Sequence, residues 1–83
     1  MRTTTAVVMP KVGLTMETAE IVTWLKAAGD PVEVGDPLVE FSTEKVTSEI
    51  EAPVAGILTE QLVRPGDQVA VGQAVGVIEE RGD

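Results

Sequence analysis

The chain contains no cysteine and no histidine among its 83 residues. Without cysteine it has no disulfide, no zinc finger and no thiol nucleophile. Without histidine it lacks the side chain that most often serves as general base or metal ligand. The sequence therefore holds few of the groups from which an autonomous active site is usually built.

Aromatic residues and positive charge are also scarce. The chain has one Trp and one Phe, and 6 Lys and Arg against 14 Asp and Glu give a net charge of −8. Nucleic acids and anionic membranes bind basic surfaces, so neither is an expected partner. No stretch approaches the roughly 20 apolar residues of a membrane span, and the N-terminus lacks the apolar run of a secretory signal. We expect a cytoplasmic location, or the mitochondrial matrix in a eukaryote.

Short apolar runs separated by glycine, proline and acidic residues fill the rest of the chain, a pattern typical of an all-β domain. Eight glycines and five prolines leave no long window for a helix. We expect strands near Thr4–Met9, Ala19–Leu25, Val32–Val34, Pro37–Ser42, Thr47–Ala52, Ile57–Leu62, Val69–Val71 and Ala74–Glu79. Between two of them, Arg64-Pro65-Gly66-Asp67 predicts a type II turn, because proline and glycine occupy its second and third positions.

The chain repeats itself with an offset of 37 positions, so that Gly29-Asp30 falls on Gly66-Asp67 and apolar positions fall on apolar positions. Met9-Pro10 matches Ala52-Pro53 only with an offset of 43, so the first half has six additional residues within Val12–Ala19. Two four-strand halves related by a pseudo-twofold predict a flattened barrel or sandwich with few free edges. The same symmetry places the C-terminus and the hairpin between the halves at opposite ends.

Lys45 lies in that hairpin, which we expect over Ser42 to Val46 with the lysine near its tip. Lysines at such positions are usually only solvated charges. Glu44 and the acidic chain favour the ammonium form, whereas an autonomous amine nucleophile needs desolvation or a cationic neighbour. Any chemistry at Lys45 would therefore depend on another enzyme that acylates its amine.

Several short motifs follow one another along almost the whole chain: Met9-Pro10-Lys11-Val12-Gly13, Ile21-Val22-Thr23-Trp24-Leu25, Gly29-Asp30-Pro31-Val32, Val34-Gly35-Asp36-Pro37-Leu38, Glu44-Lys45-Val46, Glu51-Ala52-Pro53-Val54-Ala55-Gly56 and Gly66-Asp67-Gln68-Val69. In this order and spacing the chain resembles the lipoyl domain of the dihydrolipoamide acyltransferase component of a 2-oxo acid or acetoin dehydrogenase complex. The resemblance implies a barrel-sandwich hybrid of two four-stranded antiparallel sheets over residues 1–79. Residues 80–83 would form a tail or the start of a linker.

The resemblance also implies a function. Lipoic acid would be joined to Lys45 through an amide by a lipoyl ligase or a lipoyl/octanoyl transferase, giving N6-lipoyllysine. The domain, as part of an acyltransferase and without an active site of its own, would take an acyl group from a thiamin-diphosphate-dependent decarboxylase. The acyltransferase catalytic domain would pass this group to coenzyme A, and dihydrolipoamide dehydrogenase would reoxidise the arm. Lipoic acid would thus provide the redox-active sulfur that a cysteine-free chain lacks.

Recognition by ligases and partners is expected to involve residues beside the lysine and in the loop before the second strand, namely Glu44, Val46, Gly13, Leu14 and Glu17. Two positions depart from the family pattern. Aspartate commonly precedes the lysine where Glu44 stands, and glycine often follows the loop glutamate where Thr18 stands. We expect no metal site, and we expect the isolated domain to be monomeric.

Two alternatives share the same predicted fold. A biotinyl carrier also has a lysine at this hairpin, but biotinyl domains typically place methionine on both sides of it, and Glu44 and Val46 do not match. An unmodified barrel-sandwich interaction module, like those in the membrane-fusion adaptors of efflux pumps, would need no attachment site. The Glu44-Lys45 pair at the hairpin tip favours a carrier over such a module.

Overall fold

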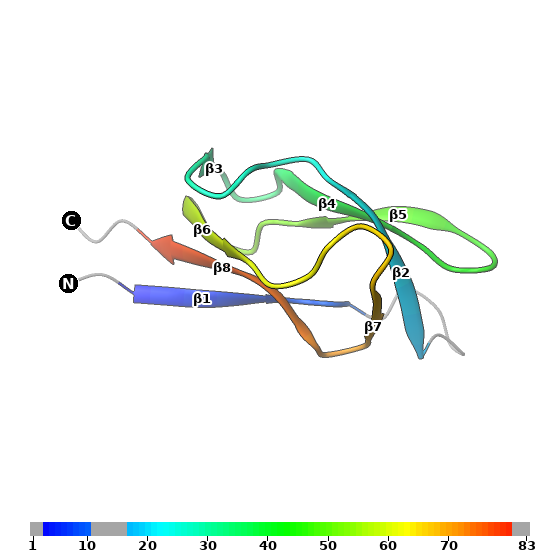
Figure 1. The fold of residues 1–83 in the computed structure, drawn as a ribbon. Helices are drawn as coiled ribbons and strands as arrows, with labels where there is room; N and C mark the ends of the chain where they lie inside the picture. The colour runs from blue at the N-terminus through cyan, green and yellow to red at the C-terminus, as the bar shows by residue number, and fades with distance from the viewer. Residues whose placement is uncertain (1–2, 11–16, 81–83) are drawn as a thin grey trace.

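The computed structural model describes residues 3–10 and 17–80, and every regular element in these ranges is a β-strand (Figure 1). The strands are β1 (Thr3–Val8), β2 (Thr18–Trp24), β3 (Pro31–Val32), β4 (Pro37–Ser42), β5 (Thr47–Glu51), β6 (Gly56–Gln61), β7 (Gln68–Ala70) and β8 (Ala74–Glu80). The all-β prediction is confirmed. Within the described ranges there is no helix long and apolar enough to cross a membrane.

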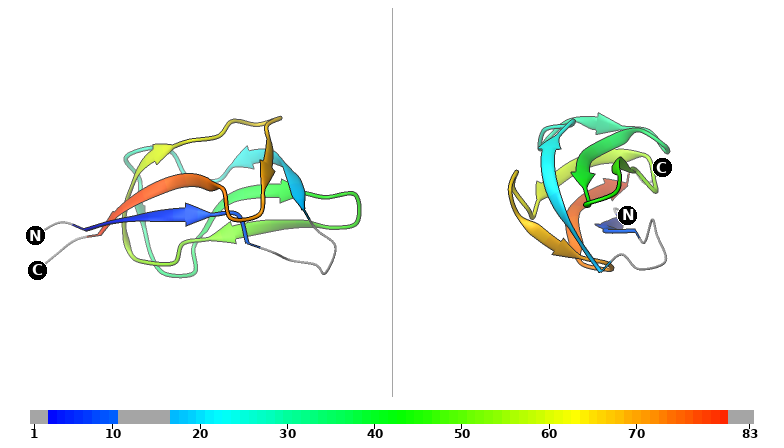
Figure 2. Two further views of the ribbon diagram at one scale, coloured as in Figure 1. Left: turned by 90° about the horizontal axis from the view of Figure 1, so that it is seen from below. Right: turned by 90° about the vertical axis from the view of Figure 1, so that its right-hand side faces the viewer.

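The strands form two four-stranded antiparallel sheets, with the orders β1-β8-β6-β3 and β5-β4-β2-β7. Replacing each strand by its counterpart in the other half, β1 by β5, β2 by β6, β3 by β7 and β4 by β8, converts one order into the other. Figure 2 shows the two sheets wrapped around a common interior. The predicted barrel-sandwich architecture and its pseudo-twofold are therefore confirmed.

Four tight turns repeat one design around the barrel. Their third residues are glycines with φ of +97°, +89°, +94° and +88°, at Gly29, Gly35, Gly66 and Gly72, a backbone region that glycine adopts without steric cost. The fourth residue of each turn accepts a hydrogen bond from the backbone N–H of the first, through the side chains of Asp30, Asp36, Asp67 and Gln73. In the turn Arg64–Asp67, the Asp67 N–H donates to the Arg64 carbonyl at 3.0 Å, as the type II prediction requires.

Backbone hydrogen bonds also confirm the second offset. The Gly35 N–H donates to the Ala52 carbonyl and the Gly72 N–H donates to the Met9 carbonyl, both at 2.9 Å. Ala52 and Met9 thus occupy equivalent places although 43 positions separate them. The six additional residues of the first half, expected within Val12–Ala19, therefore follow Met9, and positions 11–16 of this stretch lie outside the described residues.

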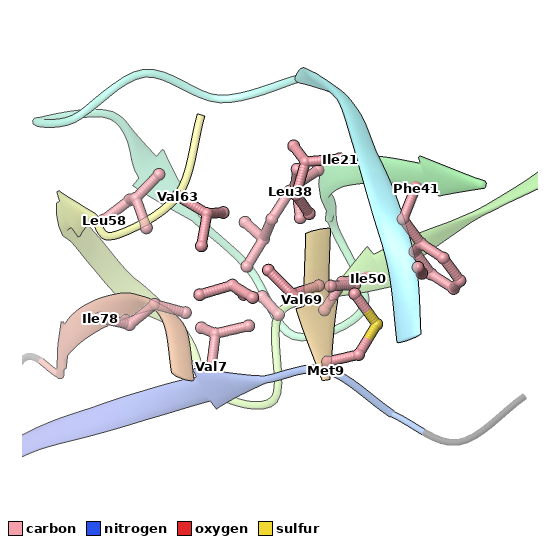
Figure 3. Close-up of a cluster of buried hydrophobic side chains, with 14 of the residues drawn as sticks. Val7, Met9, Ile21, Leu38, Phe41, Ile50, Leu58, Val63, Val69 and Ile78 are labelled. Carbon is pink, nitrogen blue, oxygen red and sulfur yellow. The ribbon is translucent and has the colours of Figure 1, made fainter. Parts of the chain in front are cut away.

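The core is one apolar cluster to which both sheets contribute (Figure 3). Its fully buried members include Phe41, Leu38 and Ile78, each 0% exposed. Trp24 is partly buried against this cluster, and its Nε1–H donates to the Val63 carbonyl at 2.9 Å. The core reaches as far as Phe41 toward the β4–β5 hairpin, since no residue from position 42 to position 48 is buried.

The two shortest strands begin one residue earlier than expected and end before the second valine of each predicted run. The strand expected over Val32–Val34 is Pro31–Val32, and the strand expected over Val69–Val71 is Gln68–Ala70. Val34 and Val71 instead belong to glycine turns and are 68% and 36% exposed. The requirement for glycine at the third turn position, rather than valine's preference for strands, decides where these strands end.

Candidate functional site: the lysine at the tip of the β4–β5 hairpin

The hairpin that carries Lys45 is held by the alternation of its two strands. Val39 and Phe41 of β4 and Ile50 of β5 point into the core, which fixes the register because a slip of one residue would expose them. The last strand pair is Ser42 opposite Thr47, and the Thr43 N–H donates to the Val46 carbonyl at 2.7 Å. The predicted hairpin is confirmed, with Lys45 at its tip.

The tip itself is organised by the hydroxyl of Thr43. Its Oγ1 accepts hydrogen bonds from the backbone N–H groups of Val46, at 3.1 Å, and Lys45, at 3.3 Å. The same hydroxyl lies 3.4 Å from the Val46 carbonyl, to which it can donate. Thr43 is not among the site residues expected from the sequence. The available signal was a threonine before a two-residue hairpin loop without glycine or asparagine, a setting in which hydroxyls often bond to nearby backbone.

The side chain of Lys45 is exposed, and within the described residues it has no hydrogen-bond or ion-pair partner. The chain has two other lysines. Lys26 is half-buried on the connection between β2 and β3, while Lys11 lies outside the described residues. Lys45 is thus the described lysine whose amine is both exposed and carried at the end of a projecting hairpin (Figure 2). Such an amine fits a group attached through an amide.

The structure places three of the five expected recognition residues. Glu44 and Val46 flank Lys45 and are both exposed, Val46 at 46%. Glu17 is exposed directly before β2, and its carbonyl accepts a hydrogen bond from the Val71 N–H at 3.0 Å. Because Glu20 pairs with Ser42 in antiparallel strands, Glu17 lies toward the same end of the barrel as the hairpin. The other two, Gly13 and Leu14, lie outside the described residues.

The sheet surface next to the hairpin is acidic. Glu40 of β4 lies directly opposite Glu49 of β5, and Glu20 of β2 lies opposite Ser42. These residues share the outward face of the sheet because their neighbours Ile21, Phe41 and Ile50 are buried. A partner that approaches Lys45 along this sheet therefore meets negative charge, in keeping with the net charge of the chain.

The biotin/lipoyl family, described as "Biotin-requiring enzyme", matches residues 5–79. The chain belongs to this family. Among solved structures, it is similar to the lipoyl domain of the 2-oxoglutarate dehydrogenase complex from Azotobacter vinelandii, with a TM-score of 0.70 and 26% identity. That likeness covers 93% of this chain and 100% of the other.

Curated relatives of the chain are also named for lipoyl chemistry. The chain is 47% identical over 74 residues to the dihydrolipoyllysine-residue acetyltransferase component of the pyruvate dehydrogenase complex of Corynebacterium glutamicum, covering 89% of the chain and 11% of the relative. It is 44% identical over 69 residues to the corresponding component of the acetoin cleaving system of Bacillus subtilis, covering 83% and 17%. The chain thus spans less than a fifth of either relative's length.

These similarities confirm the expected family and fold. They favour a lipoyl domain over the biotinyl alternative, because the relatives and the structural neighbour are named for lipoyl chemistry. A domain of this class is a carrier rather than an enzyme, and its cofactor is lipoic acid attached covalently to a lysine.

Proposed function

We propose that Lys45 is the lysine that carries lipoic acid, as N6-lipoyllysine, and that the domain transports acyl groups within a 2-oxo acid or acetoin dehydrogenase complex. The observation that carries the proposal is the amine of Lys45, exposed at the tip of a hairpin that extends past the buried core. Amide formation removes the lysine charge at this tip. It leaves the arm outside the barrel, within reach of a partner's active site.

The chain's own residues hold the Lys45 amine in place and surround it with exposed surface. The core-facing residues of β4 and β5 fix the base of the hairpin, while Glu44 and Val46 offer exposed surface on either side of the amine. When bound, lipoic acid would supply a redox-active disulfide that takes up an acyl group. The domain would hold this group away from its own core and present it to one partner after another. Tethering to the rest of a complex would raise its local concentration at each partner.

The partners follow from the names of the relatives, which are acyltransferase components of pyruvate, acetoin and 2-oxoglutarate systems. We infer a thiamin-diphosphate-dependent decarboxylase as acyl donor, an acyltransferase catalytic domain as acceptor site and dihydrolipoamide dehydrogenase as the enzyme that reoxidises the arm. A lipoyl ligase or lipoyl/octanoyl transferase would load Lys45. The proposed location is the cytoplasm, or the mitochondrial matrix in a eukaryote.

Intact-mass measurement tests the proposal directly. The purified domain is incubated with a lipoyl ligase, ATP and lipoic acid, and we expect the mass of one lipoyl group to be added. The Lys45→Arg variant keeps the charge but loses the acylable amine, so it should gain no mass. Lys26→Arg is the matched control and should be modified like the wild type. Addition of biotin by a biotin ligase instead, or a lipoyl group retained in Lys45→Arg, would overturn the proposal.

A further inference from the structure

Thr43 is the residue of the hairpin tip whose side chain crosses the turn and bonds to the backbone of its second half. Its Oγ1 accepts from the N–H groups of Lys45 and Val46, at 3.3 and 3.1 Å. We propose that Thr43 is a positioning residue for lipoyl attachment: its hydroxyl holds the turn in the conformation that presents the Lys45 amine to the modifying enzyme. This inference rests on the proposed modification of Lys45.

The backbone of the tip explains why a hydroxyl is needed there. Two-residue hairpin loops usually adopt primed turns, which require positive φ and therefore favour glycine or asparagine. Glu44 and Lys45 occupy this loop, and no non-glycine residue in the described ranges has positive φ. The turn therefore adopts another geometry. The Thr43 hydroxyl provides an acceptor for the two N–H groups of its second half.

Packing does not hold the tip. No residue from position 42 to position 48 is buried, and the nearest core residues are Phe41 and Ile50. Beyond the pair of Ser42 and Thr47, two kinds of interaction among the described residues hold the turn: the hydrogen bond from the Thr43 N–H to the Val46 carbonyl, and the hydrogen bonds of the Thr43 hydroxyl. Loss of the hydroxyl should consequently loosen the tip and leave the barrel folded.

A loosened tip should slow modification. The enzyme that loads Lys45 has to accept its backbone in one orientation, and a turn that samples several conformations binds less well because the enzyme has to order it. Loss of the Thr43 hydroxyl should therefore weaken binding of the domain to this enzyme, which raises the KM of lipoyl attachment more than it lowers kcat. Under the 37-residue offset Thr43 corresponds to Glu80 at the opposite end of the barrel, where a carboxylate replaces the hydroxyl and accepts a hydrogen bond from the Thr5 hydroxyl at 2.9 Å.

The test compares lipoyl attachment in four variants. Thr43→Val preserves shape but removes the hydroxyl, and we expect kcat/KM of the ligase to fall about tenfold, chiefly through KM, as for loss of a positioning contact. Thr43→Ala should behave in the same way, which separates hydroxyl loss from the added methyl group of valine. Thr43→Ser should restore the wild-type rate. Thr59→Val is the matched control, because the Thr59 hydroxyl also bonds to backbone, at the Val77 carbonyl, on the other sheet.

A structural readout accompanies the kinetics. In Thr43→Val the amide hydrogens of Lys45 and Val46 should exchange faster by NMR, while the thermal midpoint remains that of the wild type. Equal attachment rates for wild type and Thr43→Val would overturn this inference alone, as would failure of Thr43→Ser to restore the rate. A wild-type domain that accepts no lipoyl group would overturn the proposed function itself, and this inference with it.

Discussion

At the scale of single residues, Gly56 shows where the fold depends on a missing side chain. A Cβ at this position, where β6 begins, would overlap the backbone carbonyl of Glu79 in β8. Backbone cannot rotate away as a side chain can, so the strands would have to separate. We expect Gly56→Ala to lower the free energy of unfolding by about 1–3 kcal/mol, as overpacking does. Urea denaturation followed by circular dichroism measures the loss.

The neighbouring Ala55 provides the control for Gly56. Its side chain is exposed, and Ala55→Ser should leave the unfolding midpoint close to that of the wild type, as most surface substitutions do. A Gly56→Ala domain as stable as Ala55→Ser would show that β6 and β8 can separate at no cost, contrary to the close approach seen here.

Residue roles differed in how far the sequence could predict them. The place of Lys45 at a hairpin tip was predictable because alternating residues on both sides, among them Phe41 and Ile50, specify two strands and their register. The role of Thr43 was not, because its hydroxyl reaches two N–H groups only in a turn of particular φ and ψ. Sequence leaves open which turn a Thr-Glu-Lys-Val loop adopts.

At the scale of elements, the β4–β5 pair carries an unfavourable charge arrangement. Glu40 and Glu49 lie directly opposite each other on the outer face, and like charges in this position destabilise an antiparallel pair. We expect Glu49→Lys to raise the free energy of unfolding by about 0.2–1 kcal/mol, since it replaces repulsion by attraction. The gain should shrink in high salt, which screens exposed charges. Urea denaturation at low and high ionic strength measures both effects.

Glu51→Lys is the matched control for this pair. Glu51 is also exposed on β5, but its cross-strand partner is Pro37, which has no charge. Both substitutions change the net charge equally, so only the cross-strand interaction distinguishes them. Stabilisation of the same size in Glu51→Lys would mean that overall charge, rather than the Glu40–Glu49 pair, limits stability.

The strands show how far pattern alone predicts an element. All eight were expected in the right order, because inward apolar residues alternate with exposed polar ones and glycine turns separate them. The ends of β3 and β7 were misplaced because each is short and is followed by a valine that faces solvent in a turn. In strands this short, the conformation that the glycine turn requires has more influence on the last strand residue than the β propensity of the valine.

At the scale of the whole molecule, the pseudo-twofold applies to backbone and core but not to the outer faces. Glu20, Glu40 and Glu49 on one sheet correspond to Ile57, Val77 and Ala6 on the other. The symmetry of the backbone was predictable because turn glycines and buried residues have to repeat for both sheets to close one core. Outer positions are free of this constraint, so each face can be adapted to what it meets.

The same symmetry supplies a matched pair of sites for asking which end of the barrel the modifying enzyme covers. Thr4 and Thr47 correspond under the 43-residue offset, and both are exposed at the start of an edge strand. Thr47 adjoins the Lys45 hairpin, opposite Ser42, whereas Thr4 pairs with Glu79 at the far end of the barrel (Figure 1). Because the chain lacks cysteine, Thr4→Cys or Thr47→Cys introduces a unique thiol for a bulky maleimide polymer.

We expect the polymer on Thr47→Cys to stop lipoyl attachment, because it occupies the space through which the ligase reaches the Lys45 amine. The polymer on Thr4→Cys should leave the rate unchanged, and both unlabelled variants should be modified like the wild type. Intact mass after a timed reaction measures all four samples. Inhibition by both labels would mean that the ligase contacts the barrel at both ends. Inhibition by the Thr47 label alone would mean that the ligase binds at the hairpin end and does not need the surface around Thr4. The far end of the barrel would then be free for a tether.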